Sequence, residues 1–173
     1  LVERSAALVE YARERCEQAL AEHWSDTERG SMLFVDGGIS GSERIARSAN
    51  VVGVVKSHRR LYAEGDDMRT VLGLRSGERS TVFRVAPARR AAVASWYLRL
   101  RDPTGHDPMW GLVRVEIAQP DEAGLASGVL TPRANEISRW VLAEAAPLAL
   151  PDARWDKMVY GVRDCEEFLR AVV

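Results

Sequence analysis

Two short apolar runs, each followed closely by a charged residue, constrain the fold of this chain more than any other feature. They are MLFVD at residues 32–36 and VVGVVKS at residues 51–57. Apolar runs of this length, bounded by turn residues, are typical of buried strands. The connection GISGSERIARSAN is too polar for a core and is long enough for a tight connection or one turn of helix. The sequence therefore predicts two buried strands that present Asp36 and Lys56 at their ends.

Alternating patterns farther along the chain predict three more strands. These are TVFRV at residues 81–85, SWYLRL at 95–100 and GLVRVEIA at 111–118. Apolar and polar residues alternate in the last two with the period of an extended strand. They are separated by RDPTGHDPMW, whose Asp-Pro and Thr-Gly pairs are typical of turns. We therefore expect an antiparallel hairpin with a long loop.

Helical spacing of apolar residues predicts the remaining elements. The expected helices cover residues 1–23, 67–72, a segment that begins near Pro132, and 162–173. The first of them is amphipathic, with Cys16 on its apolar face. Cys165 occupies an apolar position of the last. Because two distant cysteines form neither a metal-binding pair nor a disulfide framework, we expect both to be buried thiols in a cytosolic protein.

The order of these elements predicts an α/β or α+β layer structure with a mixed sheet. The chain has 173 residues, of which 46% are hydrophobic, so we expect a single domain over 1–173. Its net charge of -1 lacks the global electrostatic footprint of a stand-alone nucleic-acid binder, so any such surface must be local. No window approaches the ~18 apolar residues of a membrane span, and the N-terminus does not resemble a signal peptide. We expect a soluble, cytoplasmic protein.

Asp36 is the strongest candidate for a chemical role. It follows a buried strand and precedes Gly37, Gly38 and Gly41. Glycines let the chain turn sharply and keep side chains away from an approaching phosphate. Carboxylate oxygens suit Mg or Mn, and two such ions roughly 4 Å apart would clamp a displacement at phosphorus. The alternative is an aspartate that only opens a glycine-rich turn or caps a short helix.

Three further residues sit on strands that could border this acid. Lys56 ends the second strand, either as a phosphate contact or as a solvated lysine that blunts a strand end. Arg114 and Glu116 share one face of a later strand. They either form a structural ion pair or line the site with a carboxylate.

The densest basic run of the chain is KSHRR at residues 56–60. Its members His58, Arg59 and Arg60, together with Lys56, either track a nucleic-acid backbone or belong to a solvated loop. His23 and His106 are isolated histidines without ligand spacing, which we interpret as structural or exposed. Trp110, in the loop beside Gly111, is the tryptophan that we single out for possible exposure. No Walker sequence, dinucleotide fingerprint, or serine or cysteine nucleophile motif is present.

The order of these motifs resembles the NurA nucleases. FVDGGIS, VVGVVKSHRRLY, SWYLRL and GLVRVEI, within residues 31–118, carry the resemblance, with weaker agreement in WDKMVYGVRDCEEFLR. It implies a ribonuclease H-like mixed sheet flanked by helices. It also implies a manganese- or magnesium-dependent nuclease that acts on DNA ends, works as a dimer and is partnered with a HerA-type hexameric ATPase. By this resemblance Asp36 corresponds to the second metal-binding aspartate of the family.

The pattern of the family is incomplete in this sequence. The first catalytic aspartate of the family belongs to an upstream Asp-Gly motif, and the late tyrosine and histidine ligand region is not recognisable after residue 160. We therefore expect a fragment of a longer chain, a partner chain that completes the site, or an inactive member kept for protein interaction. With Asp36 we assign Glu116 as the second catalytic candidate. A phosphate-binding domain that uses the glycines is a weaker third interpretation.

Overall fold

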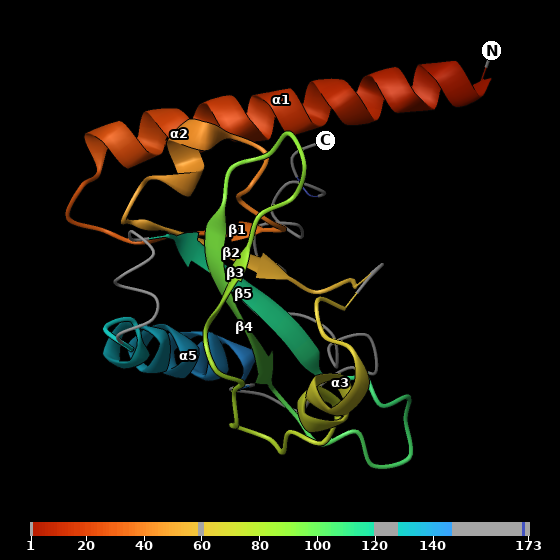
Figure 1. Cartoon of the computed structure of the whole chain (residues 1–173). Helices are drawn as coiled ribbons and strands as arrows, with labels where there is room; N and C mark the ends of the chain where they lie inside the picture. Colours follow the sequence, from red (N-terminus) through yellow and green to blue (C-terminus); the bar gives the residue numbers. More distant parts are fainter. Residues whose placement is uncertain (1, 59–60, 120–127, 147–170, 172–173) are drawn as a thin grey trace.

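A computed structural model describes residues 2–58, 61–119, 128–146 and 171. Five strands form one sheet in the order β1-β2-β5-β4-β3, with helices around it (Figure 1). The strands are β1 Leu33–Asp36, β2 Val51–Val55, β3 Phe83–Val85, β4 Val93–Arg99 and β5 Leu112–Ala118, and the helices are α1 Val2–Thr27, α2 Glu43–Ala46, α3 Gly65–Leu72 and α5 Thr131–Ala145. The expected α/β class with a mixed sheet flanked by helices is confirmed, and the arrangement is compatible with a ribonuclease H-like fold.

The strand pairing brings the chemically interesting residues to one end of the sheet. β1 and β2 are parallel, so both end at the same edge. β5 runs antiparallel to β2, with Val55 opposite Arg114, so the start of β5 lies beside the end of β2. β4 and β5 form the expected antiparallel hairpin. Asp36, Lys56 and the loop before β5 therefore lie at neighbouring strand ends.

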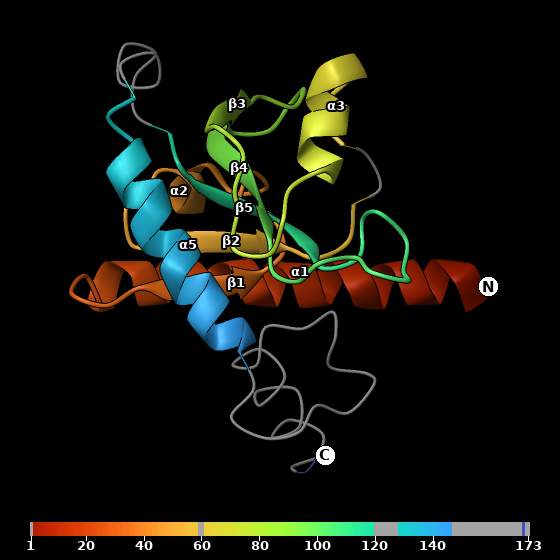
Figure 2. The same ribbon diagram turned by 90° about the horizontal axis from the view of Figure 1, so that it is seen from below.

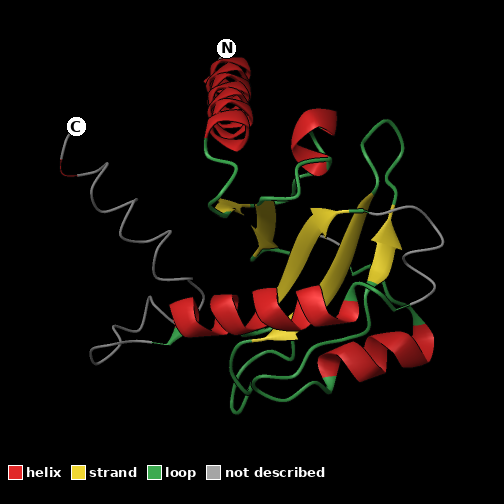
Figure 3. Cartoon of the chain, turned by 90° about the vertical axis from the view of Figure 1, so that its left-hand side faces the viewer, coloured by secondary structure: helices red, strands yellow, loops and turns green. Residues whose placement is uncertain are grey.

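Helices cover both faces of the sheet. α5 packs Ile137 and Val141 on the face that carries Trp96. On the other face α2 contributes Ile45, and α3 contributes Val71. Figures 1 and 3 both place the strands between α1 and α5, and in the view from below α5 lies in front of them (Figure 2). The central strands are covered on both sides, as their continuous apolar runs indicate.

Arg99 of β4 fixes the loop between β4 and β5. The residue is fully buried, with 0% exposure. Its guanidinium donates to the backbone oxygens of Leu72 at 2.9 Å, Leu74 at 3.1 Å and Trp110 at 2.6 Å. Because a buried charged donor requires hydrogen-bond acceptors, the end of α3 and the loop near Trp110 are held in one place.

The prediction that α1 buries its apolar face is wrong. Leu8 is 68% exposed and Leu20 is 69% exposed. Cys16 is also exposed, which contradicts the expected buried thiol, whereas Cys165 lies outside the described residues. The helix instead presents Ala21 and Ser25, both buried, to the body of the protein.

Polar contacts explain this orientation of α1. Glu22 accepts a hydrogen bond of 2.6 Å from Ser42, and Arg44 forms ion pairs with Glu22 and Asp26. Asn50 donates to the backbone oxygen of Ser25 at 3.4 Å. Small and polar residues therefore select the docked face of α1, and apolar periodicity does not detect such a face.

The remaining helices follow the sequence with small shifts. The short helix expected near Asp67 begins at Gly65, and the polar connection after β1 contains one turn of helix, α2. The helix near Pro132 is α5. The helix expected over 162–173 lies almost wholly outside the described residues. Among the described helices, none is long and apolar enough to cross a membrane.

Candidate functional site

The buried carboxylate of Glu116 organises the chain after Asp36. Glu116 is 1% exposed and lies on β5. Its Oε2 accepts a hydrogen bond of 2.8 Å from the backbone N–H of Ile39, and its Oε1 accepts one of 2.7 Å from Nη2 of Arg114. Both carboxylate oxygens are therefore engaged within the protein, and the segment 37–41 is tied to the centre of the sheet.

Glycines make this close approach possible. Gly53 interrupts the valines of β2, and a Cβ at this position would lie 2.7 Å from the backbone oxygen of Gly37. A Cβ on Gly38 would lie 2.9 Å from Oε2 of Glu116. Gly37 has a φ of 125°, a conformation that side chains rarely adopt. The glycines that follow Asp36 therefore serve the packing of the loop on Glu116.

Arg114 is the cationic partner in this cluster. The residue is 8% exposed, and its guanidinium carbon lies 4.7 Å from the centroid of the Tyr62 ring. The backbone N–H of Tyr62 donates to the hydroxyl of Tyr97 at 2.8 Å, which anchors the backbone of Tyr62 beside the sheet. Among the described residues, Nε of Arg114 has no hydrogen-bond partner. The sequence left two alternatives for Arg114 and Glu116, a structural ion pair or residues that line the site. The structure shows the ion pair, and both residues also line a groove.

Asp36 forms a second, separate ion pair. Its Oδ2 lies 2.8 Å from Nζ of Lys56, and the side chains are 42% and 17% exposed. In the register Asp36 is opposite Val54, whereas Glu116 is opposite Gly53. Paired positions share a face and alternate along a strand, so the two carboxylates leave the sheet on opposite faces. The structure joins Asp36 with Lys56 but does not join Asp36 with Glu116.

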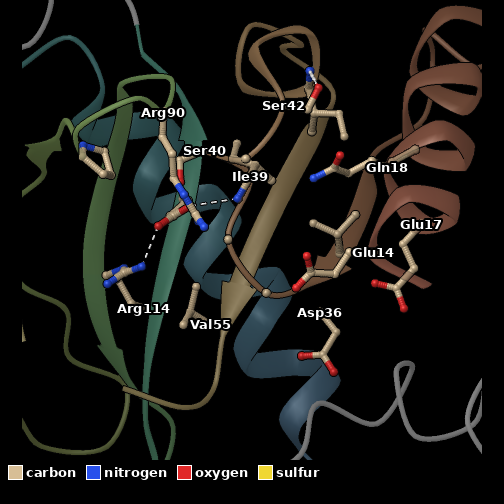
Figure 4. Close-up of a pocket in the computed structure, with 18 of the residues that line it drawn as sticks. Glu14, Glu17, Gln18, Asp36, Ile39, Ser40, Ser42, Val55, Arg90 and Arg114 are labelled. Carbon is tan, nitrogen blue, oxygen red and sulfur yellow. Dashed lines mark hydrogen bonds and ion pairs between the residues drawn. The ribbon is translucent and has the colours of Figure 1, made fainter. Parts of the chain in front are cut away.

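A groove of about 530 Å³ is lined by both residues of the Arg114–Glu116 pair and by Asp36 of the second pair. It runs between α1 and the glycine loop, and Arg90, Arg114 and Asp36 are among its lining residues. Figure 4 shows Asp36 and Glu14 toward one end and the two arginines toward the other. One end of the groove therefore carries carboxylates, and the other carries two arginines together with the carboxylate of Glu116, which is paired with Arg114.

No local sequence pattern marks several residues of this groove as candidates for a functional site. Arg90 lies in the loop before β4, Tyr62 follows the basic run, and Glu14 is one of many charged residues of α1. Each reaches the groove only through tertiary packing. A pattern confined to neighbouring residues does not identify them.

His58 points inward, unlike the solvated residue of the alternative interpretation. Its Nε2 lies 2.9 Å from the backbone oxygen of Leu112, which as a carbonyl can only accept, so Nε2 carries the proton. Burial lowers the pKa of His58, the bond to Leu112 opposes this shift, and the charge of Arg114 lowers the pKa further. The imidazole is therefore neutral near pH 7. Arg59 and Arg60 lie outside the described residues.

Asp36 fits one position of a divalent-cation site. Its carboxylate is half exposed at a strand end, and its described protein partner is a lysine that a cation can replace. Glu116 has no free oxygen in this arrangement. Within the described ranges, no group of three or more histidine, cysteine, aspartate or glutamate residues is placed to hold a metal ion.

No protein-family model matches this chain, and no curated protein matches it.

We predict that Gly53→Ala destabilises the protein by about 1–3 kcal/mol, because the added methyl group forces the backbone of Gly37 away from β2. Urea unfolding measures the loss. Gly30→Ala is the matched control, since no atom lies within 4 Å of a Cβ there. Equal stabilities of the two variants would contradict the proposed close packing of the loop.

We predict that His58 makes the protein less stable as the pH falls below about 6.5. Because its pKa is lowered on folding, the unfolded chain binds the proton more tightly, and acidification favours unfolding. Urea midpoints at pH 7.5 and 5.5 should differ less in His58→Gln than in the unsubstituted protein. The exposed residue His23 provides the control His23→Gln, which should keep the full difference. An unchanged pH dependence in His58→Gln would show that His58 does not contribute.

Proposed function

We propose that this chain is a metal-dependent DNA nuclease of the NurA type, or part of one. It would use Mn or Mg and act on DNA ends with a HerA-like ATPase in the cytoplasm, as a homodimer or with another chain that completes its site. The observation that carries the proposal is Asp36, a half-exposed carboxylate at the end of β1 that borders a groove whose far end contains Arg90 and Arg114. The order of the Asp36, Lys56 and Glu116 motifs along the chain supports the same class.

The roles of the described residues follow from their contacts. A bound divalent cation polarises a phosphoryl oxygen and lowers the pKa of a water nucleophile. Asp36 offers a carboxylate oxygen to such an ion, and Lys56, released from Asp36, offers its ammonium group to a phosphate. Arg90 and Arg114 place positive charge along the other part of the groove. Glu116 acts as a positioning residue, because both of its oxygens hold the protein in shape.

A second candidate function is a catalytically inactive nuclease-like subunit that serves as a protein-interaction module. The specific observation in its favour is a set of exposed apolar side chains on α1. Leu8, Val9, Tyr11 and Leu20 are between 62% and 70% exposed. Exposed apolar residues on one element are a common feature of surfaces that bind another protein. The near-neutral net charge of -1 fits this function as well.

We predict that Asp36→Asn lowers Mn-dependent cleavage of DNA at least about 100-fold, because loss of even the outer partners of metal ligands costs 10- to 100-fold. The assay uses single- and double-stranded substrates with Mn added or chelated. Asp67→Asn on α3 is the matched control, since it removes one exposed carboxylate that does not line the groove. Circular dichroism checks that both variants are folded.

The same assay separates the two candidate functions. Cleavage that requires Mn and Asp36 supports the nuclease. Cleavage that persists in Asp36→Asn removes Asp36 from the mechanism. No cleavage by the unsubstituted protein, with or without a HerA-like ATPase, favours the inactive subunit.

A further inference from the structure

A second pocket lies beside Lys56, which is one of its lining residues. Its volume is about 300 Å³, and it forms where β2 ends and β5 begins. Ligand pockets in proteins start near this size, so it suits one small planar group. The lining residues are Lys56, Ser57, His58, Leu100, Asp107, Met109, Trp110, Gly111, Leu112 and Val113.

Trp110 gives this pocket a fixed aromatic wall. Its ring stacks on His106 with a centroid distance of 4.3 Å and an interplanar angle of 9°. The backbone is held at both ends, since Arg99 donates to the oxygen of Trp110 at 2.6 Å and the N–H of Trp110 donates to Asp107 at 2.8 Å. The indole remains partly exposed. A ring fixed before binding loses little conformational freedom when a second ring stacks on it.

The charges around the pocket favour a base over a phosphate within it. His58 forms part of the wall, and burial keeps it neutral near pH 7. Leu100, Met109 and Val113 add apolar surface. The charged residues of the wall are Asp107 and Lys56, and Nζ of Lys56 lies 2.8 Å from Asp36, which lines the groove. An aromatic and apolar cavity with a cation at its rim matches a nucleotide whose base stacks inside while its phosphate stays at the rim.

We infer that this pocket binds one unpaired nucleobase of the strand whose phosphate lies at Asp36 and Lys56. The inference deepens the proposed function, on which it rests, by naming the substrate as a single strand or a frayed end. A paired base is stacked within its duplex, whereas an unpaired base has two open faces for an aromatic side chain. Stacking tolerates any base, so the pocket selects unpaired structure and not sequence.

The test measures binding of a short oligothymidylate by fluorescence anisotropy with divalent cations chelated, so that no cleavage occurs. Trp110→Ala should weaken binding roughly 5- to 150-fold, the range of aromatic stacking on one base. Trp140→Ala is the matched control, because Trp140 lies on α5 and is also partly exposed, at 36%. It should bind as the unsubstituted protein does.

Two further comparisons keep the result interpretable. Trp110→Phe keeps an aromatic face and should retain most of the affinity, whereas Trp110→Leu should not, even if Trp110→Ala fails to fold. An abasic oligonucleotide of the same length has the phosphates but no bases, and Trp110→Ala should not change its binding.

The outcomes separate this inference from the proposed function. Equal affinity of Trp110→Leu and the unsubstituted protein for oligothymidylate overturns the base pocket, even if Mn-dependent cleavage is observed. Equal loss of affinity for the abasic oligonucleotide also overturns it, since the effect would then not depend on bases. A loss of affinity in Trp110→Ala that is seen with oligothymidylate but not with the abasic oligonucleotide supports the base pocket. If Mn-dependent cleavage is then absent, that result counts against the nuclease and not against the pocket.

Discussion

The architecture of the site depends on one buried carboxylate. Glu116 accepts hydrogen bonds from the backbone of Ile39 and from Arg114, and it is almost fully removed from solvent. Loss of one partner of such a buried pair typically costs about 3–5 kcal/mol, because the other charge stays buried without compensation. Because Gly38 and Gly53 have no side chains, the loop that follows Asp36 can pack closely against β2 and the carboxylate of Glu116. The path of the chain away from Asp36 is therefore set by an interaction on the opposite face of the sheet.

The two ion pairs of the site have different roles. The Arg114–Glu116 pair is buried and shapes the groove, whereas the Asp36–Lys56 pair is partly exposed at the strand ends. Partly exposed pairs contribute little to stability and exchange partners readily. Under the proposed function, a cation would bind Asp36 and a phosphate would bind Lys56 without unfolding the core. Lys56 lines the pocket of Trp110, and its partner Asp36 lines the groove, so this ion pair links the pocket and the groove.

The sequence predicted the strands well because their signals are local. Alternation and short apolar runs located all five strands, and turn residues indicated the hairpin of β4 and β5. The face that α1 buries was mispredicted, because its docking depends on polar contacts such as that of Glu22 with Ser42. The separation of Asp36 from Glu116 depends on the register between β2 and β5, which sequence patterns do not specify. The stack of Arg114 on Tyr62 likewise requires two distant segments to meet.

The proposed function requires that Asp36 present its carboxylate to a divalent cation at the end of the sheet. A titration with Mn²⁺ monitored through the amide resonances of the ¹⁵N-labelled protein tests it directly, because the paramagnetic ion broadens signals near its binding site. If Asp36 binds the ion, the signals of Gly37, Gly38 and Ser57 will broaden first. If other signals disappear while those of Gly37, Gly38 and Ser57 stay sharp, the ion binds elsewhere and Asp36 is not its ligand.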